Sequence, residues 1–394
     1  MKFGCLYVRC TDNIGDDIQT YAQAQFLPQI DYYIDRETLK VFHSEAHEPV
    51  ACIMNAWYMN QPLMAWPPSQ DIIPLLTSVH FDSRLDGYWA KNQFARSYLE
   101  KHAPIGCRDT TTLQKLQSMR IPSYYSGCMT LTLKGWEDIE RQDYICLVNV
   151  SESVEKYFAS LNVPYRIISQ QNESLVDISI QERLKAAESL LRLYQSAKCV
   201  VTSRLHCALP CLALKTPVLV EYRDDFKDRF AGLSNLLRLT SAEEICKGKW
   251  DAFFRSPEKN KTFYLALRES LIEQCCGFVD NVNAHAIKTK AFDEIEQQKY
   301  YQDILMNLSD LYKANRPFWE NWYNAVDISR MEENVETAWN YVRCYEKDMQ
   351  LKQQECEQAW EYVKKYEKQV AAQRNQLNAQ NREIIQLKRE RKSK

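Results

Sequence analysis

Short apolar runs alternate with segments of helical spacing along roughly the first 290 residues of the chain. Residues 2–8 predict a strand, and Ile18, Tyr21 and Ala22 then keep one helix face until Pro28 ends the helix. The same alternation starts again after a polar stretch near the middle of the chain. Alternating strands and helices predict an α/β fold with two parallel-sheet domains.

Composition divides the chain into three parts. The polar and charged stretch from Lys134 to Asp143 is the best candidate for a linker. We therefore predict an N-terminal domain over residues 1–135, a second domain over residues 143–290 and a helical extension over residues 291–394. A length of 394 residues is enough for two domains with a substantial core.

The extension carries a repeat with the period of a coiled coil. The segment 336–342 recurs 21 residues later as 357–363, and 21 residues are three heptads. Apolar residues from Val335 to Ile384 keep a seven-residue spacing, although the companion stripe includes polar side chains. We predict a C-terminal helical coiled coil that self-associates, and hence a homo-oligomer. Its basic tip, residues 388–394, is suited to contact anionic lipid heads, but a solvated tail is the commoner role of such a segment.

A polar corner between two buried strands is the clearest functional candidate. Residues 200–220 predict a strand, a turn, a short helix and a second strand. Ligands bind at the carboxyl ends of strands in such sheets, and a helix N-terminus favours an anion. We expect the Ser203 hydroxyl to cap the helix, Arg204 to supply a cation for phosphate or carboxylate, and His206 to transfer protons. The alternative is a structural cap with Arg204 paired to a carboxylate.

A second polar corner follows the first predicted strand. Four residues there are candidates for ligand contact: Asn13, Gly15, Asp16 and Asp17. The single glycine does not make a dinucleotide-binding fingerprint. The Asp16 carboxylate suits a hydroxyl or amine donor, or acts as a base toward one; alternatively, Asp16 and Asp17 only complement the helix N-terminus. Residues 35–37 and Asn55 follow the next two strands, so we expect them on the same edge of the sheet.

Other properties exclude several classes of protein and site. The formal net charge of −2 gives no reason to expect a nucleic-acid partner. The sequence contains no apolar run of about 18 residues, so we expect no transmembrane helix. The N-terminal residues do not form a secretory signal, so we expect a cytoplasmic protein with reduced thiols. We expect no metal site, because the 14 cysteines lack zinc-site spacing and His43 with His47 is more often a solvated face than a ligand pair. His80 has no recognisable partner in the sequence.

Four segments occur in the order expected of one family: Asn13–Thr20, Gly106–Asp109, Tyr125–Cys128 and Ser203–His206. With these segments the sequence resembles the polysaccharide pyruvyl transferase family of bacterial surface-glycan enzymes, over roughly residues 1–240. The resemblance implies two Rossmann-like domains arranged as in GT-B glycosyltransferases, with the site in the cleft between them. It also implies that phosphoenolpyruvate donates a pyruvyl group, which is attached as a ketal across two sugar hydroxyls. No cofactor is expected beside this donor.

The resemblance also implies roles for the corner residues. The family's Arg-Leu-His element, linked to donor binding, falls on Arg204, Leu205 and His206. The residues expected to bind phosphoenolpyruvate are Ser203, Arg204, Leu205 and Arg108. Those expected on the acceptor side, in the first domain, are Asn13, Gly15, Asp17 and Asn55. Because adding an alcohol to the enol carbon needs an acid and a base, we assign these catalytic tasks to His206 and Asp16.

Two other functions are compatible with the sequence. A GT-B-type glycosyltransferase using a nucleotide sugar would share the fold, with Glu221 holding a ribose unless it only pairs with Arg223. A non-catalytic coiled-coil assembly protein of a glycan pathway is the second alternative. The acceptor we expect is a glycan or a lipid-linked saccharide, which suits a cytoplasmic enzyme in peripheral contact with the inner face of the membrane.

Overall fold

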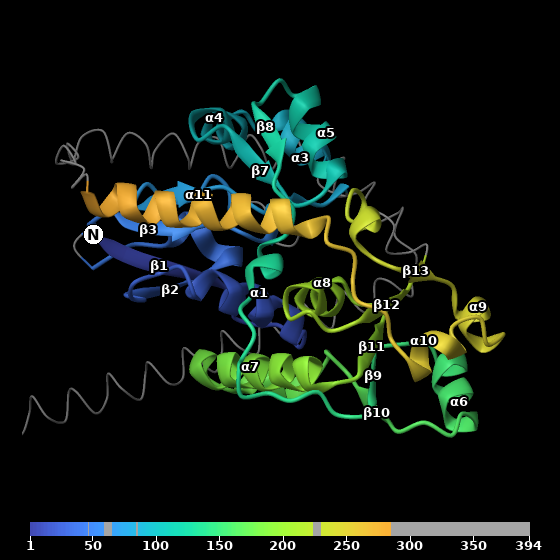
Figure 1. The fold of residues 1–394 in the computed structure, drawn as a ribbon. Helices are drawn as coiled ribbons and strands as arrows, with labels where there is room; N and C mark the ends of the chain where they lie inside the picture. The colour runs from blue at the N-terminus through green and yellow to red at the C-terminus, as the bar shows by residue number, and fades with distance from the viewer. Residues whose placement is uncertain (46, 59–64, 84–85, 224–229, 285–394) are drawn as a thin grey trace, which may run out of the picture. The chain divides into compact units, whose positions relative to one another are not determined.

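The computed structural model describes residues 1–45, 47–58, 65–83, 86–223 and 230–284. The predicted coiled coil and its basic tip lie outside these residues, so self-association and lipid contact stay predictions. Strands and helices alternate along the described chain, which confirms the α/β class with parallel sheets (Figure 1). None of the described helices is long and apolar enough to cross a membrane.

The first half is built on a four-stranded sheet in which every pairing is parallel. In spatial order its strands are β2 (Tyr32–Asp35), β1 (Lys2–Tyr7), β3 (Val50–Ile53) and β5 (Ile72–Leu75). The chain moves from β1 to β2 on one side and then crosses to β3 on the other, so the strand order reverses between β1 and β3. At such a switch point the loops diverge and leave a crevice at the carboxyl ends of the strands, where ligands bind.

Smaller elements complete the first half. Two short parallel pairs are β4 (Trp57–Tyr58) with β6 (His80–Phe81), and β7 (Ile105–Cys107) with β8 (Ser123–Tyr125). The helical segments are α1 (Ile14–Ala24), η1 (Arg36–Val41), α3 (Asp86–Lys91), α4 (Gln93–Lys101), α5 (Thr110–Ser118) and η3 (Met129–Thr132). Aromatic rings of Trp66, Phe81 and Trp89 pack edge to face or tilted in the core beside these pairs.

The second half is built on a five-stranded parallel sheet. In spatial order its strands are β10 (Tyr165–Ile168), β9 (Ile145–Val148), β11 (Cys199–Thr202), β12 (Val218–Glu221) and β13 (Leu239–Thr240). Its helical segments are α6 (Glu152–Ser160), η4 (Glu173–Asp177), α7 (Ile180–Ser196), α8 (Leu205–Ala213), η6 (Ser234–Leu236), α9 (Ala242–Cys246) and α10 (Asp251–Arg255). After them the chain forms one more described helix, α11 (Tyr264–Ala284). The strand order reverses between β9 and β11, so this sheet too has a switch point, at residues 149 and 203.

The two halves share apolar cores. Ile18 and Ala22 of α1 are buried in the same cluster as Leu191 of α7 and Leu209 of α8, so α1 packs between its own sheet and the second half. The last described helix, α11, packs back onto the first sheet (Figure 1). Its residues Val279 and Val282 are buried with Phe3 and Ala51, although the sequence predicts this segment within the second domain.

The described cysteines are free thiols, and most are buried. Cys52, Cys146 and Cys199 lie in central strands with no exposed surface. Burial raises the pKa of Cys52 to about 12, so this thiol stays protonated. These three cysteines pack as small apolar side chains.

Candidate functional site

The corner after β1 lies at the switch point of the first sheet. Asn13 is the N-cap of α1, and its Oδ1 accepts a hydrogen bond from the N–H of Gly15 at 3.1 Å. Asp16, in the first turn, has both carboxylate oxygens occupied. Thr11 Oγ1 donates to one oxygen at 3.0 Å, and Gln19 Nε2 donates to the other at 3.3 Å. These bonds fix the direction of the Asp16 carboxylate before any ligand binds.

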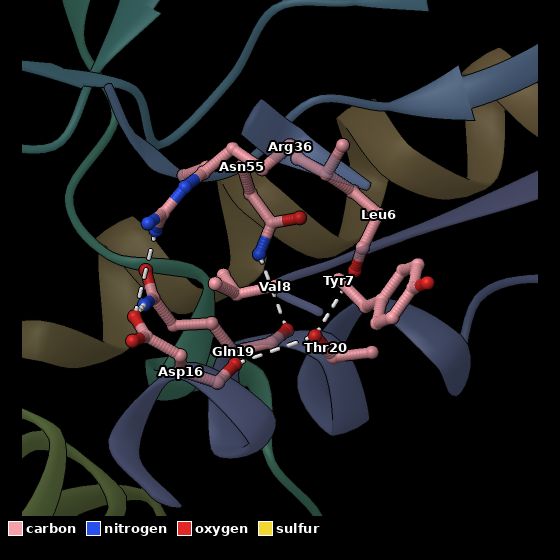
Figure 2. A pocket seen from close by; sticks show the side chains of 9 residues that line it. Leu6, Tyr7, Val8, Asp16, Gln19, Thr20, Arg36 and Asn55 are labelled. Carbon is pink, nitrogen blue, oxygen red and sulfur yellow. Dashed lines mark hydrogen bonds and ion pairs between the residues drawn. The ribbon is translucent and has the colours of Figure 1, made fainter. Parts of the chain in front are cut away.

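A small pocket opens between this corner and the ends of β2 and β3 (Figure 2). Asp16, Gln19, Arg36 and Asn55 contribute its polar lining. The Arg36 guanidinium is buried, lies 3.6 Å from the Asp16 carboxylate and pairs with Glu37 at 2.6 Å. The pocket volume of about 10 Å³ holds about one water molecule, so a sugar would contact its rim rather than enter it.

Asn55 also supports the corner from beneath. Its Nδ2 donates to the backbone oxygen of Gln19 at 3.3 Å, and the side chain is 4% exposed. The bond ties the end of β3 to α1 across the switch point. The expected placement of Asn13, Asp16, Arg36 and Asn55 at one sheet edge is therefore confirmed.

Asp17 faces the second half instead of the pocket. Its carboxylate is 1% exposed and lies 2.9 Å from Nη2 of Arg183 on α7. Arg183 also donates to the backbone oxygens of Val8 and Arg9, at 2.8 and 2.7 Å. Burial raises the pKa of Asp17 to about 7 although Arg183 acts in the opposite direction. The pair links α1 to α7 and gives Asp17 a structural position.

The corner after β11 differs from the predicted cap. Arg204 is the N-cap of α8 and makes no side-chain capping bond, because a guanidinium has no hydrogen-bond acceptor. Its backbone N–H donates to Thr202 Oγ1 at 3.0 Å. Ser203 Oγ donates instead to the backbone oxygen of Asn149 at 2.5 Å, and so ties the ends of β11 and β9 together. The prediction that Ser203 caps the helix is wrong, because the helix begins one residue later, with Arg204 as its N-cap.

Arg204 and His206 are the half-buried polar side chains of this corner. Arg204 Nη2 donates to Gln171 Oε1 at 2.5 Å, which orients the guanidinium. The backbone of His206 departs from helical geometry, at φ −80° and ψ 17°, and its oxygen accepts from Gln170 Nε2 at 3.1 Å. Leu205, between them, is 6% exposed and belongs to the apolar core, so it positions the corner from below.

The two corners meet. Ile14 donates its N–H to the Gln170 oxygen at 2.9 Å, and Asn172 donates to the Asp12 oxygen at 2.7 Å, so the loops run side by side. A Cβ added to Gly15 would lie 3.3 Å from Cβ of His206. The pKa of Asp12 is raised, mainly by burial, while the charge of Arg204 acts in the opposite direction. The structure thus brings Asp16 of one switch point and His206 of the other to the same region.

A third corner, after β7, forms a buried charged group. Asp109 caps α5 by accepting from Thr112 N at 2.8 Å, and its other oxygen bonds to Nδ1 of His80. Arg108 Nε lies 3.8 Å from the same oxygen, and all three residues are at most 2% exposed. Arg108 therefore offers no exposed surface to a donor in this structure. The sequence gives no signal for the partnership of His80 with Asp109, because the two residues are 29 positions apart.

The electrostatics of this third corner favour a neutral histidine beside an ionised aspartate. Burial and the charge of Arg108 lower the pKa of His80, against the effect of Asp109. Burial alone would raise the pKa of Asp109, but the hydrogen bond from His80 and the charge of Arg108 bring it below its usual value. Because a carboxylate only accepts, Nδ1 of His80 carries the proton.

Glu221, which we considered as a ribose ligand, is already bound within the protein. It is 2% exposed and accepts a hydrogen bond from the backbone N–H of Ser151 at 2.8 Å. The bond joins the end of β12 to the start of α6. Glu221 therefore stabilises the second sheet edge and presents little surface to a ligand.

The sequence that forms these corners matches a known family. The family model described as polysaccharide pyruvyl transferase matches residues 13–225, which is more than half of the chain and includes all four corner segments. No curated protein matches the chain. Among solved structures, the chain is similar to a functionally uncharacterised protein from Klebsiella pneumoniae, at 14% sequence identity and a TM-score of 0.36. That match covers 61% of this chain and 93% of the other.

Proposed function

Because the chain belongs to the polysaccharide pyruvyl transferase family, we propose that it transfers a pyruvyl group from phosphoenolpyruvate to a sugar. The acceptor is a glycan or its lipid-linked precursor, and two of its hydroxyls form a ketal with the pyruvyl carbon. The single observation that carries the assignment of residues is the approach of Gly15 to His206, which joins the two switch points. Donor and acceptor then meet between the two halves, as in GT-B glycosyltransferases.

The donor side uses Arg204 and the start of α8. Phosphoenolpyruvate carries a phosphate and a carboxylate, so its site needs cations and N–H donors. Arg204 supplies a planar cation that Gln171 orients, and the helix N-terminus favours an anion at the same place. We assign Ser203 and Leu205 to positioning this corner, since the hydroxyl of Ser203 is bound to Asn149 and Leu205 is buried.

The chemistry needs one acid and one base. The first sugar hydroxyl loses its proton and adds its oxygen to the enol carbon of phosphoenolpyruvate, while the methylene carbon gains a proton and becomes a methyl group. The carbon–oxygen bond to phosphate then breaks, and the second hydroxyl oxygen bonds to the same carbon and loses its proton. The products are the ketal and one phosphate. We assign His206 to deliver the first proton or contact the phosphate, and Asp16 to accept a hydroxyl proton.

The acceptor side is the rim of the pocket beside Asp16. Gln19, Arg36 and Asn55 hold donors and acceptors around that rim, a composition that suits sugar hydroxyls. Asn13 and Gly15 shape the backbone between this rim and His206. We assign Asp17 a structural role because Arg183 occupies its carboxylate. Arg108 is assigned to positioning, through its place beside Asp109.

The proposal is tested by incubating the full chain with labelled phosphoenolpyruvate and a panel of lipid-linked glycans. Ketal formation and phosphate release in equal amounts are the expected result. His206→Gln should lower the rate, whereas Lys156→Ala, a change of an exposed residue on α6, should leave it unchanged. Normal pyruvyl transfer with unaltered donor affinity in His206→Ala would falsify the assignment.

The same preparation separates this function from nucleotide-sugar transfer. Phosphoenolpyruvate is expected to protect the chain against thermal unfolding, and UDP or GDP is not. The burial of Glu221 favours this outcome, because its carboxylate presents little surface to a ribose. Protection by a nucleotide alone would favour the glycosyltransferase.

A further inference from the structure

The segment after η1 folds back so that two histidines face one aspartate. His43 and His47 lie on this loop, and Asp71 immediately precedes β5. His43 Nδ1 and His47 Nδ1 lie 3.5 and 3.3 Å from the same oxygen, Oδ2 of Asp71. The two imidazole rings are 5.2 Å apart between centroids. The three residues offer two nitrogens and one oxygen, all within 4.8 Å of one another.

These separations fit a shared metal ion better than two direct ion pairs. Charge-assisted hydrogen bonds between nitrogen and carboxylate are usually about 2.7–2.9 Å long, and both contacts here are longer. Ligands at about 2.0–2.2 Å from a tetrahedral zinc ion are instead separated from one another by about 3.3–3.6 Å. The distances of 3.5 and 3.3 Å between Asp71 and the two histidines match the edges of such a tetrahedron.

The aspartate is preorganised for this role. Its side chain is 11% exposed, and the backbone N–H of Ser44 donates to Oδ2 at 3.0 Å. The loop is fixed in turn by the bond from Ser44 Oγ to the Glu48 oxygen at 2.8 Å. The backbone of His47 lies in the left-handed region, at φ 51°, which turns the chain so that its ring reaches Asp71. A carboxylate ligand held by a neighbouring N–H is the usual support of a metal site.

We propose that His43, His47 and Asp71 bind a zinc-type divalent ion. Two imidazoles and one carboxylate favour zinc over magnesium or calcium, which prefer oxygen ligands. Three protein ligands leave the fourth position of the tetrahedron to water. The ion cross-links the loop after η1 to the segment before β5, so its role is to stabilise the first half. None of the three residues lines the pocket of Asp16, and the site is independent of pyruvyl transfer.

The test is titration of the metal-free full chain with Zn²⁺ by calorimetry, together with thermal unfolding. We expect one site whose occupancy raises the melting temperature. His43→Asn and His47→Asn should each weaken binding by at least about tenfold, the lower end of what even indirect partners of a metal contribute. Asn tolerates the left-handed backbone at position 47, so this variant is expected to fold.

Glu45→Ala is the matched control, because Glu45 is exposed and lies on the same loop without being one of the three ligands. It should bind Zn²⁺ as the wild type does. Equal weakening by Glu45→Ala, unchanged binding in both histidine variants, or no binding by the wild type would each overturn the proposal. Co²⁺ spectra report the ligand type: absorption from thiolate ligands that persists in His47→Asn would assign the ion to cysteines instead, and its absence is expected.

Discussion

Gly15 lies so close to His206 that a Cβ at position 15 would be 3.3 Å from the Cβ of the histidine and 3.0 Å from Oδ1 of Asn13. The residue belongs to the first turn of α1, and His206 to the first turn of α8. Glycine at this position therefore sets the distance between the two helix N-termini. It does so through the absence of a side chain, since its backbone is helical rather than left-handed.

Gly15→Ala is expected to lower activity more than stability. The added methyl group must push His206 or Asn13 away by a few tenths of an ångström, and small displacements of reacting groups cost up to about 100-fold in rate. Alanine also gains about 0.5–1 kcal/mol in a helix, which offsets part of the crowding. Steady-state kinetics and urea unfolding of the same preparation measure the two effects.

Gly277→Ala serves as the control, because nothing lies within 4 Å of a Cβ at that helical position. It should add the helix gain of about 0.5–1 kcal/mol without changing turnover. A Gly15→Ala enzyme with full activity would show that the spacing of the two corners does not matter to the reaction.

The sequence predicts where polar corners fall but not what their side chains bond to. Parallel strands end at a common edge, so the placement of Asp16, Asn55 and Arg204 follows from the alternation of elements alone. Ser203 satisfies the rules for a helix cap, but the helix takes Arg204 as its N-cap, and the Ser203 hydroxyl donates to Asn149. The switch points were not predictable either, because spacing along the chain does not encode strand order.

Ion pairs between residues far apart in the sequence could not be predicted either, because spacing along the chain does not show which elements become neighbours. Asp17 and Arg183 are 166 residues apart, and His47 is 24 residues from Asp71. At the level of the sequence, Asp17 has the features of an acceptor-side carboxylate, and His43 with His47 those of a solvated face. In each case the prediction lacked the charged partner, Arg183 or Asp71, which lies on another element of the fold.

Arg183→Leu is expected to destabilise the folded chain by about 3–5 kcal/mol at about pH 8, where Asp17 is ionised in the wild type, since removing one member of a buried ion pair leaves the other uncompensated. The change also removes the donors to the backbone oxygens of Val8 and Arg9. Lys185→Leu, on an exposed position of the same helix, should change the free energy of unfolding by less than about 0.5 kcal/mol. Urea unfolding measures both; equal stabilities would mean that α1 and α7 are held by apolar contacts alone.

The raised pKa of Asp17 predicts a pH dependence of stability. An exposed aspartate titrates near about 3.9, whereas burial raises the pKa of Asp17 to about 7 in the folded chain. Between these values the folded state binds the proton more tightly, so this residue makes stability fall as the pH rises from about 4 to about 7, with no further change above.

Asp17→Asn should remove that slope, because the amide does not titrate while its oxygen still accepts from Arg183. The free energy of unfolding of the variant relative to wild type is therefore expected to rise between about pH 4 and about pH 7. Urea unfolding across this range supplies the measurement. A relative stability that stays constant with pH would show that Asp17 remains ionised in the folded state.

Substitutions of Arg204 and His206 should change different kinetic parameters, because we assign Arg204 to binding the donor and His206 to transferring a proton. Arg204→Ala removes charge-assisted bonds worth about 1.5–3 kcal/mol, so the KM for phosphoenolpyruvate should rise by roughly 10- to 100-fold with a smaller change in kcat. His206→Gln keeps a polar side chain of similar length but cannot deliver a proton at neutral pH, so kcat should fall by about 10²- to 10⁴-fold. The pH profile of kcat separates the roles further, since the limb that belongs to the acid is expected to disappear in His206→Gln and persist in Arg204→Ala. If both variants only raised the KM, His206 would be a phosphate contact, and the acid would have to be sought among other groups at the meeting of the two corners.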